Sequence, residues 1–198
     1  MDDVVLRAMQ KWPDVRNVYG WLELDRRGQW LVKGSSGRFD VIRNSAIRDF
    51  IGRNYACDRR GRWFFQNGPQ RVFVGLHVAP WVYRLEDRGE GLMTHTGRPV
   101  NDVEDLYLDE HGSLFVKSEP GVGLLLDRDL PAILDRLQAE NERLAREEAL
   151  LELASWPGPA SLRLFGKSVA FSAVRSGELP ARFGFVLRPA PQPGEPEC

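Results

Sequence analysis

The side chains best suited to binding chemistry surround one short turn, Asn67-Gly-Pro-Gln-Arg71. The amides of Asn67 and Gln70 can hydrogen-bond a polar edge, and the guanidinium of Arg71 can hold an anion. Trp63, just before the turn, can stack on a flat ligand, and Trp30 of an earlier hairpin would face it. These residues predict a site for an anionic small molecule. The alternative is a turn whose amides satisfy their own backbone and whose tryptophan belongs to the core.

Signals for catalysis and metal binding are weaker. His95, between two threonines, could bind phosphate or act as a general base, although a surface histidine beside a turn is the simpler interpretation. The three histidines do not have metal-ligand spacing, and the sequence holds no nucleophile elbow and no phosphate-binding glycine loop. Cys57 is interpreted as a buried strand cysteine, despite the two arginines that follow Asp58. We therefore expect no catalytic residue, no metal and no cofactor, with an enzyme built on His95 as a third hypothesis.

The elements that would position these residues are marked by a repeated turn. Asp25-Arg-Arg-Gly28, Asp58-Arg-Arg-Gly61 and Asp109-Glu-His-Gly112 each stand between two strand-like runs, 33 and 51 residues apart. The aspartate can accept backbone hydrogen bonds and the glycine can supply a positive φ. A duplicated hairpin explains the matching flanking residues, whereas D-x-x-G is also a good turn that could arise three times independently.

The order of elements predicts an α+β fold with duplicated β-hairpin motifs. Residues 1–54 read as a small N-terminal lobe of helix, hairpin and helix, with Asn44 capping the second helix. Residues 55–154 read as a pleckstrin-homology-like β-barrel, started by the aromatic stretch at 55–78 and capped by a helix. Residues 155–188 would form a C-terminal β extension, and the proline-rich residues 189–198 a disordered tail.

The capping helix is predicted to span residues 129–154. Asp129 can cap it, Pro131 fits its first turn, and leucines follow at alternating steps of four and three. Its charged second half could instead pair with a protein partner or a second copy of the chain. This makes a protein-interaction adaptor the second hypothesis for function.

Two longer stretches resemble known bacterial families. The run at 61–85, with Gly61-Arg-Trp63, Pro69, Arg71-Val-Phe-Val74 and Ala79-Pro80-Trp81, is similar to domain-of-unknown-function family 1285, as is the run from Thr94 to Leu134. The similarity covers about residues 19–140. The opening residues 1–15 and the run 52–72 look closer to an uncharacterised proteobacterial family, domain of unknown function 2946. The resemblance implies two lobes with duplicated hairpins, a pleckstrin-homology-like second lobe, a nucleotide-like ligand between the lobes and a role in signalling.

Composition is that of an ordinary globular protein, with 42% hydrophobic and 28% charged residues among 198. The net charge of −1 conceals a basic segment, because residues 26–62 hold ten Lys/Arg and three Asp/Glu. Such a segment favours anionic partners, although arginines can also simply solvate turns. The near-neutral total argues against nucleic acid. Two cysteines, no signal peptide and no membrane-spanning run point to the cytoplasm. The leading hypothesis is a non-enzymatic, ligand-binding or regulatory module that recognises an anionic small molecule.

Overall fold

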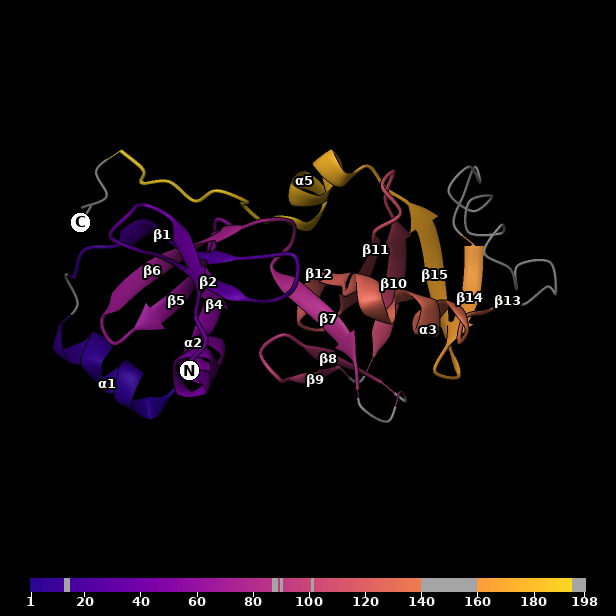
Figure 1. Ribbon diagram of the computed structural model, residues 1–198, viewed down its shortest axis with the longest axis horizontal. Coiled ribbons are helices and arrows are strands. Elements are labelled where there is room, and N and C mark those ends of the chain that lie inside the picture. The colour runs from indigo at the N-terminus through magenta and orange to yellow at the C-terminus, as the bar shows by residue number, and fades with distance from the viewer. Residues whose placement is uncertain (13–14, 87–88, 90, 101, 140–159, 194–198) are drawn as a thin grey trace. The chain divides into compact units, whose positions relative to one another are not determined.

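The computed structural model describes residues 1–12, 15–86, 89, 91–100, 102–139 and 160–193. The chain is α+β and divides into two compact units, of which the first contains Met1–Pro80 together with the chain from Gly184 onwards, and the second contains Trp81–Phe183. Each unit holds a large curled sheet, compatible with a barrel capped by a helix (Figure 1). In the described part of the chain no helix is long and apolar enough to cross a membrane.

The first unit is built on a sheet that has six strands among the described residues, in the order β3-β2-β1-β6-β5-β4. Neighbours are antiparallel except β1 and β6, which run parallel. The sheet therefore consists of two three-stranded meanders, β1-β2-β3 and β4-β5-β6, which are joined by the pairing of β1 with β6. The elements are α1 (Asp3–Lys11), β1 (Val18–Leu24), β2 (Trp30–Lys33), β3 (Phe39–Val41), α2 (Ser45–Arg53), β4 (Tyr55–Cys57), β5 (Trp63–Asn67) and β6 (Gln70–Leu76).

The two helices of this unit differ in how their N-termini are held. Asn44 caps α2, since its side-chain oxygen accepts a hydrogen bond from the Ile47 N–H at 3.2 Å. In α1 only Val5 is buried, whereas Val4 and Trp12 are more than half exposed. The Asp2 carboxylate bonds Arg53 of α2 rather than capping α1 with its side chain.

Six strands of the second unit repeat the strand order of the first, because the second sheet read from its β9 end begins β9-β8-β7-β12-β11-β10. Among the described residues its sheet runs β13-β14-β15-β10-β11-β12-β7-β8-β9, and β7 and β12 are parallel as β1 and β6 are. The elements are β7 (Trp81–Leu85), β8 (Leu92–Thr94), β9 (Pro99–Val100), β10 (Val103–Leu108), β11 (Leu114–Ser118), β12 (Gly121–Leu125), η1 (Asp127–Asp129), α3 (Leu130–Leu134), β13 (Gln138–Ala139), β14 (Ala160–Leu164), β15 (Lys167–Ala173), η3 (Ser176–Glu178) and α5 (Leu179–Phe183).

Sequence spacing supports a duplication of this six-stranded pattern. The β2–β3 and β8–β9 turns, at 34–37 and 94–97, are 60 residues apart, and the β5–β6 and β11–β12 turns, at 67–70 and 118–121, are 51 apart. The nine-residue difference equals the length of α2, which has no counterpart in the described chain between β9 and β10. The three D-x-x-G turns thus belong to three of four related meanders.

The turns have the predicted chemistry. In each, one aspartate oxygen accepts the N–H groups two and four residues ahead, at 2.7–2.9 Å. The glycines Gly28, Gly61 and Gly112 have φ of 74°, 77° and 76°, a conformation that glycine adopts without steric cost. The fourth turn, Glu86 to Gly89, has a glycine at φ 69° but a glutamate in place of the aspartate.

The division of the chain differs from the predicted one at two segments. Strands β4, β5 and β6 complete the first sheet, because β6 pairs with β1, so residues 55–80 belong with the N-terminal lobe and do not start the barrel. The described part of the predicted extension, residues 160–188, is not a separate element: β14 and β15 join the second sheet through β10, residues Leu179–Phe183 form the helix α5, and the chain from Gly184 returns to the first unit.

The capping helix is also shorter than predicted. It ends at Leu134, and Gln138–Ala139 form strand β13 against β14. Pairing with a neighbouring strand prevails there over the helix-forming residues. The rest of the predicted helix, 140–154, lies outside the described residues, as do residues 194–198 of the predicted disordered tail.

The returning C-terminal segment is held tightly in the first unit. The Val186 N–H donates to the Gly61 carbonyl at 2.9 Å, and the Leu76 N–H donates to the Leu187 carbonyl at 2.7 Å. Phe185 is buried, and Arg188 forms an ion pair with Glu23 of β1. The segment therefore completes the unit that the N-terminal residues begin.

Candidate functional site

The predicted turn closes the β5–β6 hairpin, and its register fixes which side chains share a face. Asn67 pairs with Gln70, so Gln66 pairs with Arg71 and Phe64 with Phe73. Because side chains alternate along a strand, these last two pairs lie on one face of the sheet. We call the face that carries Phe64, Gln66, Arg71 and Phe73 the arginine face.

Two arginines lie over two phenylalanines on the arginine face. The Arg71 guanidinium is 4.7 Å from the Phe64 ring, and the Arg62 guanidinium is 4.5 Å from the Phe73 ring. Tyr19 stacks on Phe73 with ring centroids 4.6 Å apart. A flat cation over an aromatic ring is attracted to its negative face. The ring contacts therefore help to orient both guanidiniums.

The two arginines differ in their partners. Arg62 is nearly buried and pairs with the Asp58 carboxylate at 2.8 Å. Among the described residues, no carboxylate lies within ion-pair distance of Arg71, which is half-buried. Arg71 is therefore a positioned cation whose charge is not neutralised by a described neighbour.

The remaining polar residues of the turn have structural partners. The Gln70 amide donates to the Arg16 carbonyl at 3.1 Å. Gln66 is fully buried, and its Nε2 donates to the Gly68 carbonyl at 2.9 Å, while its Oε1 is buried with no hydrogen-bond donor in the described chain. Asn67 is exposed at the tip of the hairpin. Of the three residues predicted from the turn, only Arg71 lies on the arginine face.

The two predicted tryptophans lie on the opposite face of the sheet. Trp30 and Trp63 both contact Tyr55, with ring centroids 5.1 and 4.7 Å away. Trp30 is 2% exposed, and burial raises the pKa of Tyr55 well above its ordinary value. These aromatic residues pack the core beside α2, where Phe50 contacts Phe65. The structure brings Trp30 and Trp63 together, but not with Arg71.

His95 belongs to the second unit and follows strand β8. Its backbone N–H donates to the Val82 carbonyl at 2.7 Å, and its Nδ1 accepts the Val82 N–H at 3.3 Å. Its ring lies 5.6 Å from that of Trp81. Burial of the ring lowers the pKa of His95 to about 3, so it is neutral near pH 7 and a poor general base. The simpler interpretation, a surface histidine, is wrong, because His95 Nε2 is buried and Nδ1 accepts the Val82 N–H.

The lowered pKa of His95 predicts a loss of stability in mild acid. The unfolded chain binds a proton near the ordinary value of 6.5, whereas the folded chain does not until about pH 3. The free energy of unfolding should therefore fall as the pH drops from 6.5 towards 3, by up to a few kcal/mol in total. His95→Asn, which retains an acceptor for the Val82 N–H, should flatten this slope in urea titrations between pH 7 and 5. His111→Gln, at an exposed turn, should leave it unchanged; an equal slope in His95→Asn would contradict the assignment.

The predictions for Cys57 and for metal binding concern side chains outside the arginine face. Cys57 is exposed on β4 rather than buried. Partial burial of its sulfur and the nearby Asp58 charge raise the pKa of the thiol to about 11, so the neighbouring arginines do not produce a thiolate. Within the described residues, no three His, Cys, Asp or Glu side chains gather as a metal site.

The basic segment lies entirely in the first unit, since residues 26–62 precede Pro80. Because β1 and β6 are parallel, its two Asp-Arg-Arg-Gly turns lie at the same end of the sheet. The arginines at their tips are exposed: Arg26, Arg27, Arg59 and Arg60. The hairpin turn before Arg71 lies at the other end.

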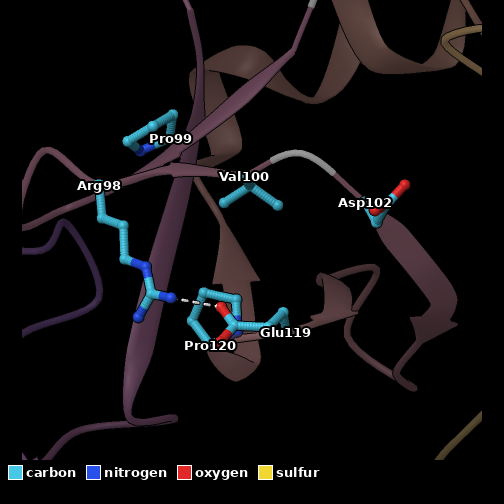
Figure 2. A pocket seen from close by; sticks show the side chains of 6 residues that line it. All are labelled: Arg98, Pro99, Val100, Asp102, Glu119 and Pro120. Carbon is cyan, nitrogen blue, oxygen red and sulfur yellow. Dashed lines mark hydrogen bonds and ion pairs between the residues drawn. The ribbon is translucent and has the colours of Figure 1, made fainter.

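Sequence reasoning missed a pocket in the second unit. It has a volume of about 340 Å³ and is lined by Arg98, Pro99, Val100, Asp102, Glu119 and Pro120 (Figure 2). Gly97-Arg98 ends the β8–β9 turn as Gly37-Arg38 ends the β2–β3 turn, but this repeat indicates only the turn and not the pocket.

These observations define a class: an α+β protein of two units, each built on the same six-stranded pattern of paired meanders. The family model described as "Protein of unknown function (DUF2946)" matches residues 1–190, and the chain belongs to that family. A crystal structure of a DUF1285 family protein from Silicibacter pomeroyi DSS-3 is 15% identical, with a TM-score of 0.52 over 82% of this chain and 84% of that one.

A second DUF1285 family structure, from Shewanella baltica OS155, is also 15% identical, with a TM-score of 0.43 over 58% of this chain and 90% of that one. No curated protein matches the chain. The Silicibacter structure confirms the expected resemblance at the level of the fold. Both family names denote unknown function, so the function is argued from the residues.

Proposed function

We propose that this protein is a non-enzymatic regulatory module that binds an anionic, nucleotide-like small molecule at Arg71. The observation that carries the proposal is the Arg71 guanidinium, oriented by Phe64 and without an ion-pair partner among the described residues. Planar guanidiniums bind carboxylate and phosphate oxygens in pairs. The basic character of the first unit adds a favourable potential for an anion.

The proposal also includes a role in signalling, a location in the cytoplasm and a relation of the second unit to pleckstrin-homology folds. A role in signalling is included in the proposal because the resemblance to family 1285 implies it. Two cysteines, one of them exposed and free, are compatible with a reducing cytoplasm. The second unit is proposed to be related to pleckstrin-homology folds, because the six strands β7 to β12 precede the five-residue helix α3.

The other two hypotheses have less support. An adaptor that uses a 129–154 helix would need a continuous helix through Gln138 and Ala139, where β13 stands instead. An enzyme that uses His95 would need a base able to take up a proton near pH 7, whereas this pKa is about 3.

The test is the thermal shift of the full chain with nucleoside mono-, di- and triphosphates and with inorganic phosphate. Wild-type protein should be stabilised by at least one of them, and Arg71→Ala should lose that stabilisation. Arg71→Lys keeps the charge but not the fork, so its shift should be smaller. Arg48→Ala removes an exposed arginine of α2 and is the matched control. Absence of any shift, or an unchanged shift in Arg71→Ala, would overturn the proposal.

A further inference from the structure

The pocket of the second unit has the size of a small organic ligand. Its volume of about 340 Å³ falls within the usual range of small-molecule sites, roughly 300–1,000 Å³. Its apolar wall is formed by Pro99, Val100 and Pro120, of which Val100 is buried. The charged side chains Arg98, Asp102 and Glu119 stand around this wall (Figure 2).

The β11–β12 turn, which forms one wall of the pocket, is held by two aromatic residues of β7. Trp81 donates its indole N–H to the Pro120 carbonyl at 2.7 Å, and the Tyr83 hydroxyl donates to the Gly121 carbonyl at 2.7 Å. Gly121 has a φ of 131° and lies against the Trp81 ring, where a Cβ would be 3.2 Å from Nε1. Two buried aromatic residues of β7 therefore hold this turn in one conformation.

The opposite wall is held by a threonine. The Arg98 N–H donates to Thr94 Oγ1 at 3.0 Å, and the Thr94 N–H donates to the Arg98 carbonyl at 2.8 Å. Thr94 is fully buried, which fixes the backbone from which the Arg98 side chain extends. A site whose walls are set before binding loses less entropy when a ligand enters.

The Arg98 guanidinium contacts the Glu119 carboxylate at 2.5 Å, and Figure 2 shows this pair beside Pro120. The two side chains are 52% and 72% exposed, and such surface pairs contribute at most about 1 kcal/mol. Asp102 lies farther along the pocket and pairs with Lys167. The ion pair of Glu119 with Arg98 is therefore weak, whereas the backbone of Arg98 is fixed by Thr94.

We infer that the pocket binds a small monocarboxylate with an apolar body, and that Glu119 occupies the place of the ligand carboxylate when the pocket is empty. The ligand carboxylate replaces Glu119 on Arg98, and its apolar part lies on Pro99, Val100 and Pro120. The nearby Asp102 and the displaced Glu119 disfavour dianions by like-charge repulsion. This site is independent of Arg71.

The experiment uses three probes with one body and different charge: benzoate, benzamide and benzylamine. Each is titrated into the ¹⁵N-labelled full chain, and amide shifts of Arg98, Glu119 and Gly121 are followed. Benzoate should move these amides with saturation, and neutral benzamide should bind at least about tenfold more weakly, as loss of a charged contact implies. Glu119→Gln removes the internal competitor and should tighten benzoate binding by about three- to tenfold.

Two further variants complete the test. Arg98→Gln should abolish the benzoate shifts, and Arg71→Ala should leave them unchanged, which separates this site from the one proposed above. The inference is overturned if benzoate moves none of the three amides in wild type and in Glu119→Gln, if Glu119→Gln binds benzoate no more tightly, or if benzylamine binds better than benzoate. Both charged residues are exposed, so their substitution should leave the rest of the spectrum intact.

Discussion

Replacement of Gly61 by alanine is expected to destabilise the protein more than the same change at the related turn glycine Gly112. A Cβ at Gly61 would lie 2.1 Å from the Gly184 carbonyl oxygen, and this oxygen belongs to backbone that cannot rotate away. The φ of 77° adds strain of about 1–2 kcal/mol for alanine. Displacing the C-terminal segment should also break the Val186–Gly61 and Leu76–Leu187 hydrogen bonds.

Gly112 provides a matched control for Gly61. It ends the same kind of turn with a φ of 76°, but a Cβ there would meet no atom within 4 Å. Gly112→Ala should therefore show only the backbone strain, whereas Gly61→Ala should lower the unfolding midpoint by roughly 10 °C more. Hydrogen exchange should quicken at Leu76 and Val186 in Gly61→Ala alone. Equal midpoints and unchanged exchange in the two variants would refute the role of the returning segment.

Local turn chemistry was predictable because it depends on few residues. An aspartate that accepts backbone N–H groups and a glycine with positive φ form the turn whatever lies around it. The same holds for the Asn44 cap of α2. These features were therefore correct from sequence, and they predicted an α+β fold with duplicated hairpins.

The unit boundary was not predictable in this way. The parallel pairing of β1 with β6 joins strands that begin at Val18 and Gln70, and no local pattern in either strand specifies its distant neighbour. The predicted 129–154 helix failed for a related reason. Helix-forming residues describe a local preference, but the edge of β14 supplies hydrogen bonds that Gln138–Ala139 take up instead.

The division of the candidate site could have been predicted. A two-residue turn pairs Asn67 with Gln70, and alternation then places Trp63 and Arg71 on opposite faces. Trp63 and Arg71 are close along the chain, but the strand register separates them. The pocket residues required the fold, because the β8–β9 and β11–β12 turns meet only when β7 and β12 pair.

The ion pair between Arg62 and Asp58 is the second feature with a large expected effect. The two side chains are 7% and 12% exposed, and Arg62 also contacts Phe73 and donates to the Tyr19 hydroxyl at 3.3 Å. Although burial opposes ionisation of Asp58, hydrogen bonds from the Arg62 and Arg60 N–H groups and from the Arg62 side chain lower its pKa. Stability from this group is therefore present above the ordinary aspartate pKa of 3.8 and is lost as the pH falls below it.

Arg62→Met should cost about 3–5 kcal/mol of unfolding free energy, because it leaves a nearly buried carboxylate without its partner. Combining it with Asp58→Asn should cost less than the sum of the single changes, by 1 kcal/mol or more in a double-mutant cycle measured with urea. Asp25→Asn changes the equivalent turn, where the aspartate accepts the Arg27 and Gln29 N–H groups, and should cost about 1 kcal/mol. Arg59→Met, at the exposed tip beside Asp58, should stay within about 0.5 kcal/mol of wild type. If Arg62→Met cost no more than Arg59→Met, the arginine face would not depend on this pair, and the orientation of its side chains would have to come from the aromatic contacts alone.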